Sequence, residues 1–248
     1  MRFLVFFLFL FSPQVFADEI KVLSGGAAKS LVDPLAASLK GHTVKVEYQP
    51  MGRLVQTLAS LSTAGAQVDM VIVTSEVYPS LERDGRVAPG SGKAIARVGI
   101  GVAVNEKAPL PDISTAEAFK RTLLAARSVV YIDPKTGTSG KHVAEVFKKL
   151  NIEKEMQAKT TLGQGGYVTE PVGRGEIELG IHQISEILPV KGVRLVGPLP
   201  PELQKYTVYV AAALPGTQKQ PAVDAFIAHL TGSEARGRLA QAGYTSPE

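Results

Sequence analysis

Strand-type and helix-type patterns alternate along this chain, and short turns of small residues separate them. The first strand-type run, residues 20–23, ends at Ser24-Gly25-Gly26 and passes directly into a helical pattern. Further strand-type runs follow at residues 43–48, 68–73, 96–104, 128–132, 179–182, 193–196 and 206–213. Strands that alternate with helices are typical of an α/β fold built on largely parallel sheets. We therefore predict an α/β protein.

The first of these turns has the properties of an anion receptor. Gly25 and Gly26 let the backbone turn tightly and leave its amide groups unobstructed. The helix that follows adds about half a positive charge at its N-terminus. Backbone N–H groups at such a junction are suited to phosphate, sulfate or carboxylate groups. The turn thus predicts that the protein holds a small anion beside the first strand.

The first 17 residues have the pattern of a secretory signal peptide. Arg2 supplies a positive charge, residues 3–11 form an unbroken apolar run, and Val15-Phe16-Ala17 offers a small-residue cleavage site. The apolar run stops at Ser12-Pro13, short of the about 20 residues that span a bilayer. We expect cleavage after Ala17 and a mature, soluble, monomeric protein in the periplasm.

Composition excludes several classes of function. The chain has no cysteine, which rules out a thiol nucleophile, an iron–sulfur cluster and a zinc–thiolate site. The net charge is only +4 and the basic residues are dispersed, so we expect no nucleic-acid binding. The four histidines, His42, His142, His182 and His229, share no metal-ligand spacing. We predict a protein without a metal or a cofactor.

The order of the patterns predicts two lobes. The middle of the chain reads as a self-contained unit, while the last strand and helices return to the unit that the N-terminus begins. We expect lobe 1 to comprise residues 18–100 and 206–248, and lobe 2 to comprise residues 101–205. In open α/β sheets ligands bind at the carboxyl ends of the strands, so the predicted site lies between the lobes.

Six strand-to-helix turns could contribute to this site, at residues 24–27, 50–53, 74–76, 136–141, 163–167 and 182–186. Any one of these turns is common between a strand and a helix of an α/β fold, but six of them after an export signal favour a shared site. The candidate ligand-binding residues are Ser24, Gly25, Gly26, Ala27, Met51, Gly52, Arg53, Ser75, Thr138, Ser139, Gly140, Lys141, Tyr167 and Gln183.

Two cations at predicted helix starts also indicate an anionic ligand. Arg53 and Lys141 oppose the helix dipole at these positions, which makes sense if an anion lies between each cation and the amides. A nucleotide-binding phosphate loop is excluded at residues 137–141. Only two residues separate the glycines there, and His142 replaces the Ser or Thr that would hold magnesium.

The chain resembles the periplasmic solute-binding proteins of ABC importers, specifically the molybdate-binding-protein-like group, over essentially its whole mature length. The resemblance is carried by Val22-Leu-Ser-Gly-Gly-Ala, by residues 65–75, by Asp133-Pro with Ser139-Gly140, by Leu179-Gly-Ile-His-Gln183 and by residues 223–235. It implies a two-lobed type II periplasmic binding fold, a small anionic ligand and an ABC permease as partner.

The residues that hold molybdate in that group are not matched here. The group uses two serines and a tyrosine at positions that align near Ala27, near Met51-Gly52 and at Gln183. Two hydroxyl donors and the phenol are therefore missing, while Arg53 and Lys141 are nearby in sequence. An organic di- or tricarboxylate fits these cations better than molybdate or tungstate, which stay as a further alternative.

Two functions follow from this interpretation. The protein either captures an organic anion for a permease, which the pattern favours, or acts as an isomerase on the same scaffold. The resemblance permits the second, because aconitate isomerase is a periplasmic enzyme similar to this group. Interconversion of cis- and trans-aconitate needs a positioned acid/base for an allylic proton shift. The residues proposed for that role are Lys141, His182, Glu76 and Tyr48.

Overall fold

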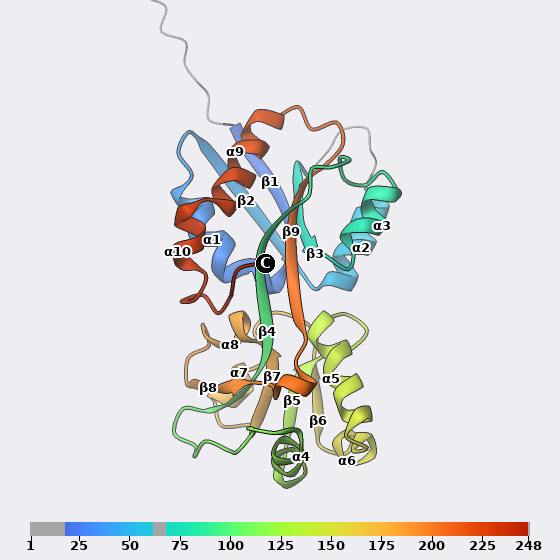
Figure 1. Cartoon of the computed structure of the whole chain (residues 1–248), viewed down its shortest axis with the longest axis vertical. Helices are drawn as coiled ribbons and strands as arrows, with labels where there is room; N and C mark the ends of the chain where they lie inside the picture. The colour runs from blue at the N-terminus through green and yellow to red at the C-terminus, as the bar shows by residue number, and fades with distance from the viewer. Residues whose placement is uncertain (1–17, 62–67, 248) are drawn as a thin grey trace, which may run out of the picture.

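A computed structural model describes residues 18–61 and 68–247 of the chain. The predicted signal peptide, residues 1–17, lies outside the described residues. Figure 1 shows an elongated molecule in which two groups of strands and helices are stacked along the long axis. The predicted α/β architecture, two lobes with helices around mixed sheets, is confirmed.

The upper lobe in Figure 1 is built on β1 (Asp18–Gly25), β2 (His42–Gln49), β3 (Met70–Thr74) and β9 (Tyr206–Ala213). β1 lies between β2 and β3 and is parallel to both, whereas β9 runs antiparallel to β3. The segments that flank this sheet are η1 (Gly26–Ala28), α1 (Lys29–Ser38), α2 (Met51–Ser60), α3 (Tyr78–Arg83), α9 (Gln220–Thr231) and α10 (Ser233–Arg238).

The lower lobe contains β5 (Val129–Ile132), with β6 (Thr160–Gly163) on one side and β7 (Leu179–Gln183) on the other, all parallel. β8 (Val193–Pro198) pairs antiparallel with β4 (Lys93–Asn105). The remaining segments are α4 (Ala116–Ala125), α5 (Thr138–Lys149), α6 (Glu153–Gln157), α7 (Glu170–Gly173), α8 (Ile184–Ile187) and η2 (Pro201–Leu203).

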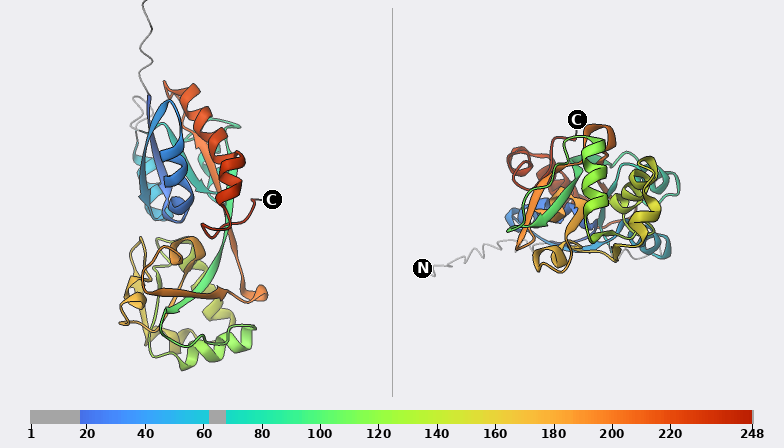
Figure 2. Two further views of the ribbon diagram at one scale, coloured as in Figure 1. Left: turned by 90° about the vertical axis from the view of Figure 1, so that its left-hand side faces the viewer. Right: turned by 90° about the horizontal axis from the view of Figure 1, so that it is seen from below.

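One long strand joins the lobes. β4 (Lys93–Asn105) pairs with β9 over residues 93–99 and with β7 over residues 100–104, so it belongs to both sheets. Figures 1 and 2 show β4 crossing from one lobe to the other beside the start of β9. The strand order β2-β1-β3-β9-β4-β7-β5-β6 is therefore continuous through the molecule.

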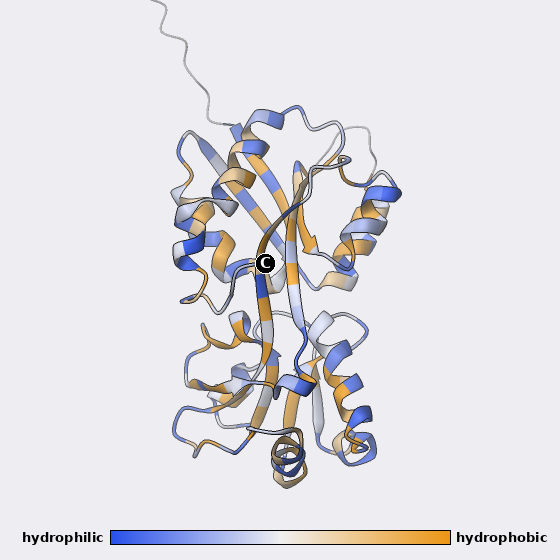
Figure 3. Ribbon diagram, in the orientation of Figure 1, coloured by the Kyte–Doolittle hydropathy of each residue, from blue (hydrophilic) through white to orange (hydrophobic). Residues whose placement is uncertain are grey.

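Each lobe has its own hydrophobic core. On β4 the change from one core to the other falls between Val98 and Ile100, both 1 % exposed. This break supports the predicted division into residues 18–100 with 206–248 and residues 101–205, which stays a prediction. Figure 3 shows hydrophobic strand segments inside the lobes and hydrophilic turns on the outer helices. No helix in the described part of the chain has the length and apolar character needed to cross a membrane.

The burial of each strand follows from its place in the sheet. All five residues of β3, which lies inside the sheet between β1 and β9, are buried. β2 is an edge strand, and its residues alternate between exposed and half-buried. β6 was not predicted as a strand, because its two central residues, Thr161 and Leu162, are both exposed and give no periodic signal.

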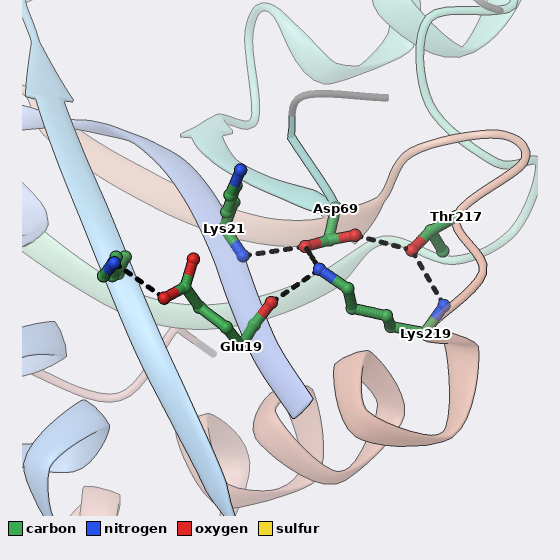
Figure 4. A network of polar contacts seen from close by, with 6 residues as sticks. Glu19, Lys21, Asp69, Thr217 and Lys219 are labelled. Atoms are coloured by element: carbon green, nitrogen blue, oxygen red, sulfur yellow. Dashed lines mark hydrogen bonds and ion pairs between the residues drawn. The ribbon is translucent and has the colours of Figure 1, made fainter. Parts of the chain in front are cut away.

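The buried carboxylate of Asp69 joins several segments of the upper lobe by hydrogen bonds. Asp69 is 4 % exposed and accepts hydrogen bonds from the backbone N–H of Lys21 (2.8 Å), Thr217 Oγ1 (3.0 Å) and Lys219 Nζ (3.1 Å). Lys219 Nζ also donates to the backbone oxygen of Glu19, at 2.6 Å. Figure 4 shows how these contacts join β1, the approach to β3 and the segment before α9.

We expect Asp69→Ala to lower the free energy of unfolding by about 2–3 kcal/mol, because it leaves three partly buried donors without their acceptor. Thermal denaturation followed by circular dichroism measures the effect. Asp224→Ala is the matched control, since Asp224 is exposed and accepts one hydrogen bond, from Gln220. Equal melting temperatures for the two variants would contradict a structural role of the Asp69 cluster.

Candidate functional site

A cavity of about 230 Å³ lies between the lobes. From the upper lobe it is lined by Gly25, Gly26, Ala27, Lys29, Tyr48, Gln49, Pro50, Met51 and Tyr209. From the lower lobe it is lined by Ile132, Gly137, Thr138, Ser139, Gly165, Gly166, Tyr167, His182, Gln183 and Glu186. Most of these residues stand where a strand ends and a helix or turn begins, so the lining follows from the topology.

The N-terminus of α5 supplies backbone donors to the lower wall. The cap residue is Gly137, and no side chain caps the helix, so the first-turn N–H groups have no partner within it. Gly140 lets this turn approach β5, because a Cβ atom there would lie 2.0 Å from the backbone oxygen of Ile132. Together with the helix dipole, these amides favour a negatively charged group beside Thr138 and Ser139.

A buried histidine–carboxylate pair lies at the junction of β7 and α8. His182 Nε2 is 3.0 Å from Glu186 Oε2, and His182 Nδ1 is 3.1 Å from Ser139 Oγ. His182 is 1 % exposed and Glu186 is 7 % exposed. The imidazole therefore has a hydroxyl beside one nitrogen and a carboxylate beside the other, and Nε2 makes no hydrogen bond of regular geometry to that carboxylate. The Ser139 contact orients the ring, and the carboxylate is close enough to exchange a proton with it.

Phenol and amide groups complete the polar lining. Burial raises the pKa of Tyr209 well above its usual value, and the charge of Glu186 raises it further. Burial, followed by a hydrogen bond to Asp33, raises the pKa of Tyr48. Both phenols therefore stay protonated and can donate. Gln183 Nε2 donates to Thr207 Oγ1 at 3.0 Å, while its buried Oε1 has no hydrogen-bond partner.

Contacts across the cavity rim hold the lobes together. The backbone N–H of Gly52 in α2 donates to the backbone oxygen of Thr136 before α5, at 3.0 Å. Ser185 Oγ in α8 donates to the backbone oxygen of Ala27 in η1, at 2.8 Å. An added Cβ atom on Gly165 would lie 2.8 Å from Pro50 Cγ, which shows how closely that side of the rim is packed. The structure is thus a closed arrangement of the lobes.

We expect Gly52→Val to hold the lobes apart. A Cβ atom at position 52 would lie 3.2 Å from the backbone oxygen of Lys135, and the methyl groups of valine need further space. Small-angle X-ray scattering should give a larger radius of gyration than for the parent protein. Ala59→Val, at an exposed position of the same helix, is the control and should leave the radius unchanged. An unchanged radius for Gly52→Val would show that this rim contact does not govern closure.

The structure brings about half of the sequence-predicted residues to the cavity. The ligand-binding candidates in its lining are Gly25, Gly26, Ala27, Met51, Thr138, Ser139, Tyr167 and Gln183, and the catalytic candidates there are Tyr48 and His182. The other candidates do not line it: Ser24, Gly52, Arg53, Ser75, Gly140, Lys141 and Glu76. Gly52 and Gly140 still shape its walls through the close contacts described above.

Helical geometry explains why the two predicted cations are elsewhere. In α2 the buried positions are Met51, Leu54 and Leu58, so Arg53 lies on the exposed side of the helix. In α5 Lys141 is likewise exposed, next to the buried Gly140. Both residues became candidates because a cation at a helix N-terminus opposes the helix dipole. Neither lines the cavity, so an anion bound in the cavity does not explain their positions.

The other three outlying candidates also have local explanations. Ser24 is fully buried and its Oγ donates to the backbone oxygen of Gly25. Glu76 is exposed and its carboxylate lies 2.7 Å from Lys205 Nζ. Ser75 is exposed, and its backbone N–H donates to the backbone oxygen of Val208.

Two charged cavity residues were not among the predicted site residues. Lys29 lies at the start of α1 and Glu186 lies in α8. Glu186 follows His182 by four residues within the sixth candidate turn, and this spacing is the signal that could have identified it. Within residues 18–61 and 68–247, no three His, Cys, Asp or Glu side chains are grouped so that they could hold a metal ion.

Comparison with known proteins defines the class. The fold matches the periplasmic molybdate-binding protein of Azotobacter vinelandii with a TM-score of 0.77 and 18 % identity, over 92 % of this chain and 100 % of that one. It matches the substrate-binding domain of a molybdenum ABC transporter from Clostridium difficile with a TM-score of 0.70 and 15 % identity, over 92 % and 99 % of the two chains. The fold is that of the type II periplasmic binding proteins.

Sequence comparison gives the family. Residues 20–245 match the bacterial extracellular solute-binding proteins, and the chain belongs to this family. The chain is also 30 % identical to an aconitate isomerase from a Pseudomonas species over 240 residues, which covers 94 % of this chain and 90 % of the relative.

Proposed function

We propose that this protein binds a small polycarboxylate between its lobes and isomerises it by moving a proton, with aconitate as the substrate. The observation that carries the proposal is the buried contact between His182 Nε2 and Glu186 Oε2, 3.0 Å apart in the cavity lining. A carboxylate in a site for anions repels the ligand unless it holds or shares a proton. Its presence is unfavourable for a simple carrier and useful for an acid/base catalyst.

The proposed reaction is an allylic proton shift. Glu186 takes a proton from the methylene carbon of the substrate, and the electron pair spreads over the three-carbon unit and its carboxylate. A proton then returns to the former vinyl carbon, so the double bond moves and no atom is gained or lost. His182, oriented by Ser139, lies 3.0 Å from the Glu186 carboxylate and is placed to share the proton that Glu186 takes.

The rest of the lining supplies the anion binding that this chemistry requires. First-turn amides of α5, the Lys29 ammonium group and the protonated phenols of Tyr48 and Tyr209 are suited to the carboxylates of the substrate. Because these donors are fixed before the ligand arrives, they can also stabilise the negative charge that develops during proton transfer. The identity to an aconitate isomerase supports this choice of substrate.

The test is proton NMR of trans-aconitate in D₂O with the purified protein, residues 18–248. We expect the cis isomer to appear together with deuterium at the exchanging carbon. Neither isomerisation nor deuterium incorporation, with tight binding measured by calorimetry, would reject the isomerase.

Tight binding without isomerisation would instead favour a second function, which is delivery of an organic anion to an ABC permease. The family and the closed arrangement around the cavity favour this alternative. Thermal-shift measurements with trans-aconitate, citrate, molybdate and sulfate separate the ligand classes. Stabilisation by molybdate alone would reject the organic-acid ligand for both functions.

We further propose that the mature protein acts as a monomer in the periplasm after cleavage behind Ala17. N-terminal sequencing and gel filtration of the exported protein test this proposal.

A further inference from the structure

A carboxylate next to the cavity occupies two of the cavity's own donors. Asp33 Oδ1 accepts a hydrogen bond from the Tyr48 hydroxyl at 2.6 Å, and Asp33 Oδ2 lies 2.5 Å from Lys29 Nζ. The Lys29 ammonium group is also 4.6 Å from the centroid of the Tyr48 ring. One carboxylate thus receives a charged donor on one oxygen and a phenol on the other.

The two donors reach the cavity, whereas the acceptor does not. Lys29 and Tyr48 line both the interlobe cavity and a neighbouring groove between α1 and β2. Asp33 lines that groove and does not line the cavity. Of the described residues that line the cavity, Lys29 is the one Lys or Arg. The donors are therefore within reach of a ligand, whereas their present acceptor is outside the ligand's space.

We propose that Lys29 and Tyr48 form a binding subsite for one carboxylate of the ligand, and that Asp33 engages these two donors from outside the cavity until the ligand takes its place as their acceptor. The inference rests on the proposed function in one respect, namely that the ligand carries carboxylates. Asp33 presents the same planar, two-oxygen acceptor that such a ligand would present, and both donors already match it. The subsite makes Lys29 the residue that selects for an anionic group at this end of the cavity.

The exchange of one carboxylate for the other is energetically easy. The side chains of Lys29 and Asp33 are 41 % and 45 % exposed, so their ion pair is screened by solvent and contributes little stability. The Tyr48 hydroxyl is more buried and stays protonated, so it needs an acceptor in either state. A ligand carboxylate inside the closed cavity is better shielded from water and can compete for both donors.

Isothermal titration calorimetry with propane-1,2,3-tricarboxylate tests the subsite. This tricarboxylate has no double bond, so it reports binding without isomerisation. Lys29→Gln should raise the dissociation constant by about tenfold or more, the effect of losing a charge-assisted hydrogen bond. Lys40→Gln removes the same charge at an exposed position of the upper lobe and is the matched control, with little expected change.

Asp33→Asn gives the diagnostic result. Without the competing charge, the dissociation constant should fall by about two- to fivefold, the value of a half-exposed ion pair. The double variant Asp33→Asn/Lys29→Gln should bind no more tightly than Lys29→Gln alone, because the gain acts through Lys29. Tyr48→Phe should weaken binding in the parent protein while leaving the melting temperature within a few degrees.

Each outcome decides the inference. The subsite would be overturned if Asp33→Asn bound the tricarboxylate more weakly than, or as tightly as, the parent protein. Equal effects of Lys29→Gln and Lys40→Gln on the dissociation constant would also overturn it. So would a parent protein that does not bind the tricarboxylate. The expected order of dissociation constants, together with no turnover of trans-aconitate, would keep the subsite and reject the isomerase. Turnover of trans-aconitate without that order would keep the isomerase and reject the subsite.

Discussion

Glu186→Gln is expected to lower the turnover number for trans-aconitate by about 10²–10⁴-fold, the usual contribution of a general acid or base. Glutamine preserves the size of the side chain and its neutral hydrogen-bonding capacity but cannot accept a proton from carbon. Because Glu186 is 7 % exposed and 3.0 Å from His182 Nε2, solvent cannot readily replace it as the proton acceptor. The loss should appear in the turnover number more than in KM.

Binding separates this chemical effect from a structural one. The dissociation constant for propane-1,2,3-tricarboxylate should stay within a few fold of the parent value, or decrease, because the variant removes a negative charge from an anion site. Glu155→Gln, an exposed position on α6 in the same lobe, is the control and should retain full turnover. If Glu186→Gln retained the parent turnover, Glu186 would not be the proton acceptor, although the cavity could still bind the substrate.

Gly140→Ala is expected to give the largest loss of stability. The added Cβ atom would lie 2.0 Å from the backbone oxygen of Ile132 and 2.9 Å from its carbonyl carbon, and these backbone atoms in β5 have no side-chain freedom to move away. The first turn of α5 must shift, at a cost of about 2–4 kcal/mol, as in other overpacked sites. For a chain of this size the melting temperature should fall by about 6–12 °C.

The same shift should reduce ligand affinity, because the first turn of α5 carries the amides next to Thr138 and Ser139 in the cavity wall. Gly237→Ala in α10 is the control, since a Cβ atom there meets nothing within 4 Å. That variant should melt at or slightly above the parent temperature, because alanine restricts the unfolded chain more than glycine does. Matching melting curves for the two variants would contradict the close packing of α5 on β5.

Much of the fold was predictable because the strands carry a strong local signal. Apolar runs predicted β3 and β5, and both strands are buried throughout in the structure. β6 escaped prediction because its register places Thr161 and Leu162 in solvent, so its hydrogen bonds to β5, and not hydrophobic periodicity, hold it in the sheet.

The site was predictable to a smaller extent. Turns at the ends of strands predicted Gly26, Thr138 and Ser139 as site residues, and all three line the same cavity. Charge alone was a poor guide, because the exposure of Arg53 and Lys141 depends on which face of each helix packs against the sheet. Lys29 has the same charge and reaches the cavity, a difference that becomes visible only when α1 is placed beside β2.

The amino-acid sequence by itself determined the α/β pattern, the small-residue turn at Ser24-Gly25-Gly26 and the absence of cysteine chemistry, because each depends on residue type and local order. The tertiary structure alone decided which turns meet. Contacts such as His182 with Ser139, or Gly52 with Thr136, join residues 43 and 84 positions apart. Local propensity carries no information about such contacts: packing within the lower lobe sets the first, and the approach of the two lobes sets the second.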